Sequence, residues 1–93
     1  MKFRISWTSR FKKDYKLAMK RGLPIEKLDD VIRMLARGET LPASYRDHAL
    51  TGNWKGHREC HIAPDWLLLY LVREDTLVLT LVRTGSHTDL LDL

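Results

Sequence analysis

Residues 57–82 read HRECHIAPDWLLLYLVREDTLVLTLV. Two tripeptides, Ala63-Pro64-Asp65 and Arg73-Glu74-Asp75, interrupt this stretch with residues that are typical of turns. The first segment alternates and the other two are rich in β-branched and large apolar residues, which predicts strands at 57–62, 66–72 and 76–82. Such short connections allow only antiparallel neighbours, so we expect a three-stranded meander.

The chain before this stretch has the pattern of one strand and two helices. Phe3, Ile5 and Trp7 alternate with polar residues, as in a strand with one buried face. Residues after the capping positions Thr8 and Ser9 follow a helical spacing that ends at Gly22, with the apolar stripe Phe11, Tyr15, Ala18 and Met19. A second helix is predicted between Pro24 and Gly38, with the stripe Leu28, Val31, Ile32 and Leu35.

The order of these elements predicts an α+β fold. We expect the N-terminal strand and an antiparallel two-helix hairpin to pack on a mostly antiparallel sheet. Residues 39–53 are rich in loop-forming residues around a short strand, and residues 86–93 are expected to form a short helix or a tail packed on the sheet. With 93 residues, the chain is expected to form a single domain, 1–93. Its 44% hydrophobic and 30% charged residues exclude a disordered tail or a fibre.

The positive charge is concentrated at the N-terminal end. The net charge is +4, but residues 1–22 hold eight basic residues and one acidic residue, for +7, and the rest of the chain carries −3. The polar faces of the first predicted helix carry Lys12, Lys13, Lys16 and Lys20. This concentration favours an anionic partner, nucleic acid first. The alternative is an ordinary solvated helix face, and both interpretations stay open.

Cysteine use and hydropathy indicate a soluble cytoplasmic protein. Cys60 is the only cysteine, which excludes an internal disulfide and favours a reducing compartment. Arg4, Ser6 and Arg10 interrupt any apolar stretch that would read as a signal peptide. The longest apolar run, residues 66–72, is far too short to span a membrane, so no membrane partner is expected.

Side-chain alternation places chemistry-bearing residues on one face of the sheet. Along the strand predicted at 57–62, His57, Glu59 and His61 share a face, and Cys60 and Ile62 share the other. Because Cys60 and Ile62 have the character of core residues, we expect Glu59 and His61 on the open face.

The strand ends next to this face supply further candidates. Asp65 lies in the turn just beyond His61, and Arg83 and His87 lie at the end of the last strand, where a meander brings strand ends together. His48, in the loop before the strands, is expected to complete the group. These residue types match metal-free RNA cleavage, which needs a base for the 2′-hydroxyl, an acid for the departing 5′-oxygen and a cation near the phosphate.

Other uses of these residues are weaker. His57 and His61 lie four apart, but the segment is predicted as a strand and lacks the H-E-x-x-H pattern; no metal site or other cofactor is predicted. Cys60 is a poor nucleophile among apolar neighbours. Trp54 and Trp66 are expected to be structural, although Trp54, beside Lys55 in a basic loop, also has the chemistry to stack on a base.

Five motifs together resemble the YafQ branch of the RelE/ParE toxin superfamily. They are YRDHAL at 45–50, GNWKG at 52–56, RECH at 58–61, PDW at 64–66 and RTGSH at 83–87. The resemblance covers essentially the whole chain. It implies a bacterial type II toxin that cleaves mRNA on the 70S ribosome and is neutralised by a DinJ-like antitoxin, with operator DNA bound only through the antitoxin complex. It also implies a microbial-RNase-like (RelE-like) fold with a curved sheet.

The resemblance also implies roles for individual residues. His48, His61, Asp65 and His87 match the catalytic positions, and Glu59 stands where relatives often have aspartate. Arg83 matches a basic residue suited to the phosphate. Lys55 and the four lysines of the first helix are candidates for RNA contact on the ground of their charge. The family often has an aromatic residue near the end, for base stacking, where this chain has Leu91.

The implied reaction is attack of the 2′-hydroxyl on phosphorus, leaving a 2′,3′-cyclic phosphate and a 5′-hydroxyl. We expect His48 to act as general base with help from Asp65, and His87 to act as general acid. His61 and Arg83 would hold the phosphate, with Glu59 orienting a histidine. Two other classes stay open: a ParE-like toxin that binds gyrase without cleaving RNA, and a non-catalytic RNA- or ribosome-binding module.

Overall fold

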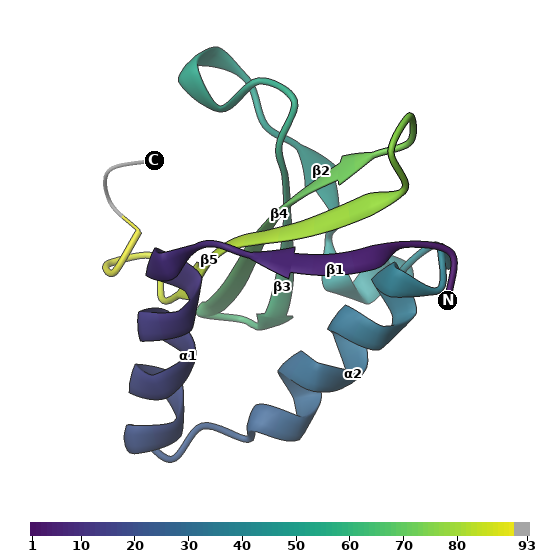
Figure 1. Cartoon of the computed structure of the whole chain (residues 1–93). Coiled ribbons are helices and arrows are strands. Elements are labelled where there is room, and N and C mark those ends of the chain that lie inside the picture. Colours follow the sequence, from purple (N-terminus) through teal and green to yellow (C-terminus); the bar gives the residue numbers. More distant parts are fainter. Residues whose placement is uncertain (91–93) are drawn as a thin grey trace.

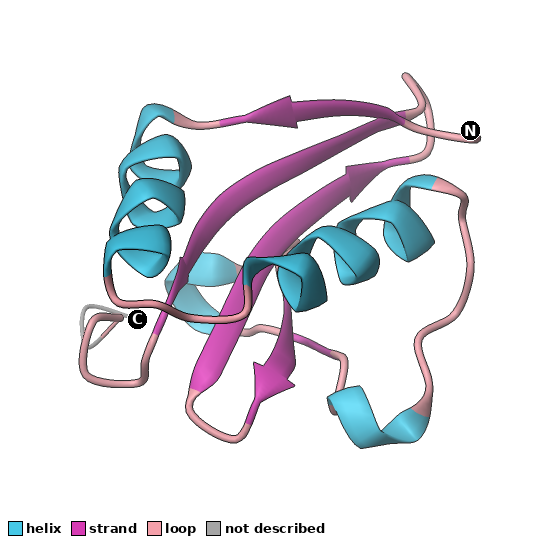
Figure 2. Ribbon diagram, turned by 90° about the horizontal axis from the view of Figure 1, so that it is seen from below, coloured by secondary structure: helices cyan, strands magenta, loops and turns pink. Residues whose placement is uncertain are grey.

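The computed structural model describes residues 1–90. Its helices are α1 (Ser9–Lys20) and α2 (Ile25–Ala36), and its strands are β1 (Arg4–Trp7), β2 (His48–Ala49), β3 (Arg58–Ala63), β4 (Trp66–Arg73) and β5 (Val78–Gly85). The strands form one sheet, and the two helices cover one of its faces (Figure 1, Figure 2). The α+β prediction and the meander of the last three strands are confirmed.

The sheet is mixed, with the order β1-β5-β4-β3-β2. Three neighbouring pairs are antiparallel, and β1 lies parallel to β5, with Arg4 opposite Val78 and Trp7 opposite Leu81. The first and last strands of the chain are therefore neighbours. The helices α1 and α2 lead the chain from β1 at one edge of the sheet to β2 at the opposite edge, and β3, β4 and β5 then lead back to β1. β2 continues the sheet at the opposite edge, where His48 pairs with Glu59.

The helix boundaries follow the predicted caps. The Thr8 side chain accepts a hydrogen bond from the Phe11 N–H at 3.0 Å, which satisfies one of the free donors at the start of α1. Gly22 and Gly38 adopt the positive φ angles of 73° and 79° that end the two helices. The predicted stripe of α2 is buried, but that of α1 is narrower than predicted: Met19 is 56% exposed. The helices also spread apart from their short connection instead of packing along their lengths (Figure 1).

The main core lies between the helices and the sheet and includes Cys60, Ile62 and Trp66. A smaller cluster occupies the other face of the sheet, where Leu90 packs on Leu67 and Leu69. Leu90 is 3% exposed, so the segment after β5 covers part of this face, as predicted for a packed tail. Leu50 and Trp54, from the segment after β2, also pack against this cluster. Neither α1 nor α2 is long and apolar enough to cross a membrane.

Candidate active site

β2 presents His48 beside β3. Its Nδ1 lies 2.8 Å from the Arg46 carbonyl oxygen. Because a carbonyl only accepts, Nδ1 donates this hydrogen bond, and the lone pair of the neutral ring resides on Nε2. Nε2 lies 3.8 Å from Oε1 of Glu59, the residue paired with His48 in the sheet. His48 therefore presents a proton-accepting nitrogen next to a carboxylate.

β3 presents Glu59 and His61 on the same side of the sheet, opposite Cys60 and Ile62 as predicted. Nε2 of His61 lies 3.9 Å from the same Oε1 that faces His48. Side chains of Glu59 and His61 are only 14% and 16% exposed. At these separations Glu59 makes no direct hydrogen bond to either ring, but it attracts whichever imidazole is protonated.

His87 is held by Asp65 at the other end of the group. Oδ1 of Asp65 accepts hydrogen bonds from the His87 backbone N–H at 2.9 Å and from its Nδ1 at 2.6 Å. These two bonds lower the pKa of the Asp65 carboxyl, the backbone bond contributing most. The rings of His87 and His61 are 5.7 Å apart between centroids. The structure thus joins five predicted site residues in one row, in the order Asp65, His87, His61, Glu59 and His48.

The turn that carries His87 is fixed by Asp89. Its carboxylate accepts the Ser86 N–H at 3.0 Å and the Arg21 guanidinium at 2.6 Å, and the Ser86 hydroxyl accepts the Asp89 N–H at 3.1 Å. The Arg21 bond and the Ser86 N–H lower the pKa of Asp89 to about 2. Gly85 is required beneath this turn, because a Cβ there would lie 2.9 Å from that of Asp89. The end of α1 therefore holds the His87 turn.

The loop that carries His48 is fixed by Asp47, which the sequence did not single out. Its carboxylate accepts the Tyr70 hydroxyl at 2.5 Å and two bonds from the Arg58 guanidinium at 3.3 Å. Burial and the Asp47 bond raise the pKa of the Tyr70 phenol. A signal was available: Tyr70 is the only polar side chain in the apolar segment 66–72 apart from Trp66, and a buried hydroxyl needs a partner.

One expectation about charged partners differs from the structure, and Arg83 has a partner that was not predicted. Asp65 assists His87 and not His48, because the β3–β4 turn lies beside the end of β5 while β2 lies across the sheet. Arg83 is 8% exposed and donates to Asp14 of α1 at 2.9 and 3.3 Å. It lines a cavity of about 470 Å³ that Asp65 also borders. The Asp14 pair uses Nε and one terminal nitrogen of the guanidinium, and the phosphate contact of Arg83 stays a prediction.

The other candidate residues from the second half of the sequence that the structure describes lie apart from the row. β3 begins after His57, so His57 does not share the predicted face: its Nδ1 is buried without a hydrogen-bond partner among residues 1–90, and its ring packs on the edge of Trp54 at 5.3 Å. Trp54 packs against the Leu67 cluster, which favours its structural role. Lys55 is exposed beside it. Leu91 lies outside the described residues.

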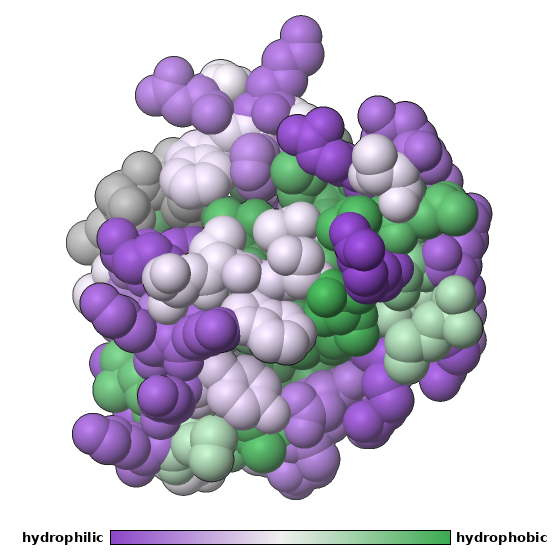
Figure 3. Space-filling model, in the orientation of Figure 1, coloured by the Kyte–Doolittle hydropathy of each residue, from purple (hydrophilic) through white to green (hydrophobic). Residues whose placement is uncertain are grey.

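The lysine face and the cysteine lie away from the row as well. Lys12, Lys13, Lys16 and Lys20 are exposed on α1, on the helix side of the sheet, where Figure 3 shows hydrophilic side chains along one flank. Cys60 is fully buried, which raises the pKa of its thiol to about 12 and makes it inert. No group of three or more His, Cys, Asp or Glu side chains in residues 1–90 has the geometry to hold a metal ion.

Comparison with known proteins gives consistent matches along the chain. Residues 3–92 match the family model described as "Bacterial toxin of type II toxin-antitoxin system, YafQ". The mRNA interferase toxin YafQ of Escherichia coli K12 is 40% identical over 87 residues, which cover 92% of each chain. The crystal structure of the E. coli DinJ–YafQ complex matches with a TM-score of 0.88 at 39% identity, over 95% of this chain and 97% of that one. A metal-bound toxin from Helicobacter pylori matches with a TM-score of 0.88 at 40% identity, over 95% and 98% of the two chains.

Proposed function

The chain belongs to the YafQ family of bacterial toxins of type II toxin–antitoxin systems, and from this premise we propose that it is an endoribonuclease that cleaves mRNA. The observation that carries the proposal is the row of three imidazoles and two carboxylates, in which Glu59 and His61 lie on the face of the sheet opposite the helices. The relative named as an mRNA interferase supports the same activity. A ParE-like toxin that only binds gyrase, or a non-catalytic RNA-binding module, has no need of such a row.

In the proposed mechanism, His48 is the general base. The Arg46 carbonyl fixes its tautomer and leaves the Nε2 lone pair available for the 2′-hydroxyl proton. The oxygen attacks the adjacent phosphorus as the proton moves to Nε2. The imidazolium that forms then lies near the negatively charged Glu59. Glu59 thus takes the assisting role at His48 that the sequence had suggested for Asp65.

His87 is the proposed general acid. Its Nδ1 proton is held by Asp65, so the proton for the leaving 5′-oxygen comes from Nε2 of the protonated ring. An ionised Asp65 stabilises that protonated ring. His61, between Glu59 and His87, is placed to contact the phosphate. The products are a 2′,3′-cyclic phosphate and a 5′-hydroxyl.

This chemistry uses protons only, and the proposal includes no metal. The test compares untreated toxin with toxin from which a chelator has removed transition metals. Both are assayed in buffer that is free of transition metals but contains the magnesium that ribosomes need. We expect stripped and untreated toxin to cleave at the same rate. A rate restored only by added zinc or copper would contradict proton-only catalysis, and the metal-bound relative makes this a meaningful comparison.

We further propose that cleavage occurs on mRNA bound to the ribosome, in the cytoplasm, with the exposed lysines of α1 contacting ribosomal RNA. Four cations on one helix supply the sequence-independent attraction of phosphate backbones. Lys55, exposed near β3, is a further candidate for RNA contact.

The proposed partner that neutralises the toxin is a DinJ-like antitoxin, as in the E. coli complex; operator DNA would be bound only through that complex. An apolar groove of about 410 Å³ beside the edge strand β1 offers a docking surface, and half-exposed Trp7 lines it. Figure 3 shows weakly polar and apolar residues gathered in the middle of this face. Lys12 and Lys16 border the groove, so an acidic amphipathic segment complements it. Trp7→Glu is expected to weaken neutralisation by co-expressed antitoxin while the free toxin still cleaves.

The central experiment is single-turnover cleavage of mRNA, free and on programmed ribosomes, with analysis of the new ends. We expect cyclic-phosphate and 5′-hydroxyl ends, mainly on ribosomes. Cleavage by His48→Gln or His87→Gln variants that melt like the wild type should be slower by about 10²–10⁴-fold. Asp75→Asn, in the exposed β4–β5 turn, is the control. A folded wild-type protein that cleaves neither substrate would overturn the assignment.

A further inference from the structure

Arg46 adopts a backbone conformation that is unfavourable for its residue type. It ends a short 3-10 helix (Ala43–Tyr45) with φ 50° and ψ 42°, in the left-handed region that glycine and asparagine adopt more easily. Its carbonyl holds His48, but any residue supplies a carbonyl. An arginine kept in a strained conformation next to a catalytic group suggests that its side chain is used.

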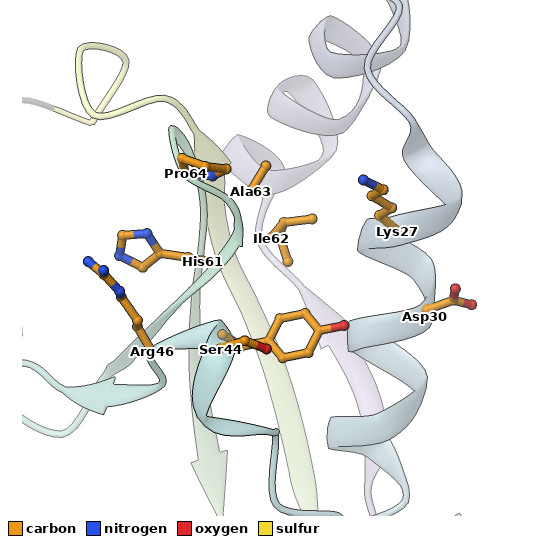
Figure 4. Close-up of a pocket in the computed structure, with 9 residues that line it drawn as sticks. Lys27, Asp30, Ser44, Arg46, His61, Ile62, Ala63 and Pro64 are labelled. Carbon is orange, nitrogen blue, oxygen red and sulfur yellow. The ribbon is translucent and has the colours of Figure 1, made fainter.

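The Arg46 side chain borders a cavity that begins at the catalytic row. The cavity has a volume of about 530 Å³, and Arg46 and His61 lie at one end of it with Lys27 of α2 across from them (Figure 4). Ser44, the half-buried Tyr45 and Asp30 are the other polar residues of the wall. Because His61 belongs both to the row and to this wall, a ligand bound at that end of the cavity would lie next to the phosphate that His61 is proposed to contact.

The cavity carries unneutralised positive charge. The side chains of Arg46 and Lys27 are exposed and form no ion pair with the acidic side chains of residues 1–90. Asp30, also in the wall, is already paired with Arg33 on the outer surface of α2. Two available cations facing one solvent-filled space favour an anion there.

We propose that this cavity binds the mRNA strand on one side of the cleavage position, with Arg46 and Lys27 contacting the phosphate next to the scissile one. The inference rests on the proposed ribonuclease function, and it adds a second binding site for the substrate. A volume of this size accommodates one nucleotide. The Tyr45 ring offers a surface for its base, and Arg46 offers a planar donor group for its phosphate.

The test is single-turnover cleavage of ribosome-bound mRNA as a function of toxin concentration, comparing wild type, Arg46→Gln and Lys27→Gln. Each substitution is expected to raise the half-saturating concentration about tenfold, the value of one charge-assisted contact, with the maximal rate much less affected. Arg73→Gln removes an equal charge from the exposed end of β4 and serves as the control. Arg46→Asn removes the guanidinium without adding backbone strain, because asparagine tolerates the left-handed conformation. The variant should melt no lower than the wild type, so any loss of binding would be due to the missing side chain.

Substrates with one uncharged methylphosphonate linkage identify the phosphate. With the neutral linkage on the correct side of the cleavage position, we expect Arg46→Gln to be no longer impaired relative to the wild type, because the contact that the substitution removes is already absent. The neutral linkage is placed on one side of the cleavage position and then on the other. If Arg46→Gln remains as impaired relative to the wild type on both substrates as on unmodified mRNA, Arg46 contacts ribosomal RNA instead and the inference is wrong. Unimpaired Arg46→Gln and Lys27→Gln variants would also refute it. A wild-type toxin that cleaves nothing would refute the proposed function itself, which is a different outcome.

Discussion

One oxygen of Asp65 accepts two hydrogen bonds from His87, from the backbone nitrogen at 2.9 Å and from ring Nδ1 at 2.6 Å. The pair joins the turn between β3 and β4 to the segment after β5. Both the backbone and the ring of His87, an otherwise exposed residue, are fixed by a single carboxylate. In the proposed mechanism, this orientation presents Nε2 to the leaving 5′-oxygen.

Asp65→Asn should slow cleavage without unfolding the protein. The amide can still accept the Nδ1 bond, but it lacks the charge that stabilises a protonated His87. We expect a loss smaller than the roughly 10²–10⁴-fold that removal of a general acid costs. Single-turnover rates of Asp65→Asn and of His87→Gln measure the two losses. A larger loss in Asp65→Asn than in His87→Gln would mean that Asp65 does more than assist His87.

Glu59→Gln should lower the cleavage rate because both neighbouring imidazoles lose the carboxylate that attracts their protonated forms. The effect should be less than additive with His48→Gln, since Glu59 is proposed to act through His48. Glu26→Gln, on the exposed start of α2, is the matched control. Additive losses in the double variant would assign Glu59 a role independent of His48.

Replacing Lys12, Lys13, Lys16 and Lys20 together by Gln should weaken ribosome binding and flatten its salt dependence. Each phosphate contact contributes roughly 0.7–0.9 to the slope of log affinity against log salt concentration. Arg37→Gln with Arg73→Gln, two exposed cations elsewhere, should change the slope little. Unchanged ribosome affinity in the quadruple variant would identify the lysines as an ordinary solvated face.

Arg21→Gln should destabilise the protein at neutral pH, and the difference should vanish in acid. The folded protein lowers the pKa of Asp89 from 3.8 to about 2, with Arg21 as the largest cause. A carboxyl with a lowered folded pKa stabilises the fold above its unfolded pKa, and this contribution is lost as the pH falls towards 2. Urea unfolding of both proteins between about pH 7 and pH 2 measures the difference in their free energies of unfolding. A free-energy difference that does not change with pH would show that packing, and not the ion pair, stabilises this turn.

Cys60→Ala should lower stability but leave the cleavage rate unchanged. The side chain is fully buried in the main core, so its truncation should cost about 0.5–3 kcal/mol of unfolding free energy. The native thiol should react with iodoacetamide far more slowly than the unfolded chain, because burial raises its pKa to about 12. A cleavage rate that falls in the folded variant would implicate Cys60 in the reaction.

Local patterns in the sequence predicted most secondary-structure elements and the face on which each strand residue lies. Glu59 and His61 face away from Cys60 and Ile62 because alternation along a strand is a property of the backbone itself. Thr8 and Gly22 marked the limits of α1 for an equally local reason, the hydrogen bonds and φ angle that helix ends require.

The tertiary structure alone decided which residues meet. Alternation does not specify which strand lies next to another, and it did not reveal that β1 pairs with β5 or that His48 lies opposite Glu59. Irregular register near Ala63 and between Leu69 and Tyr70 also shifts the positions of the strand ends relative to one another. Asp65 therefore assists His87, and Arg83 pairs with Asp14, because partners far apart in sequence are set by strand order and register, which no local pattern encodes.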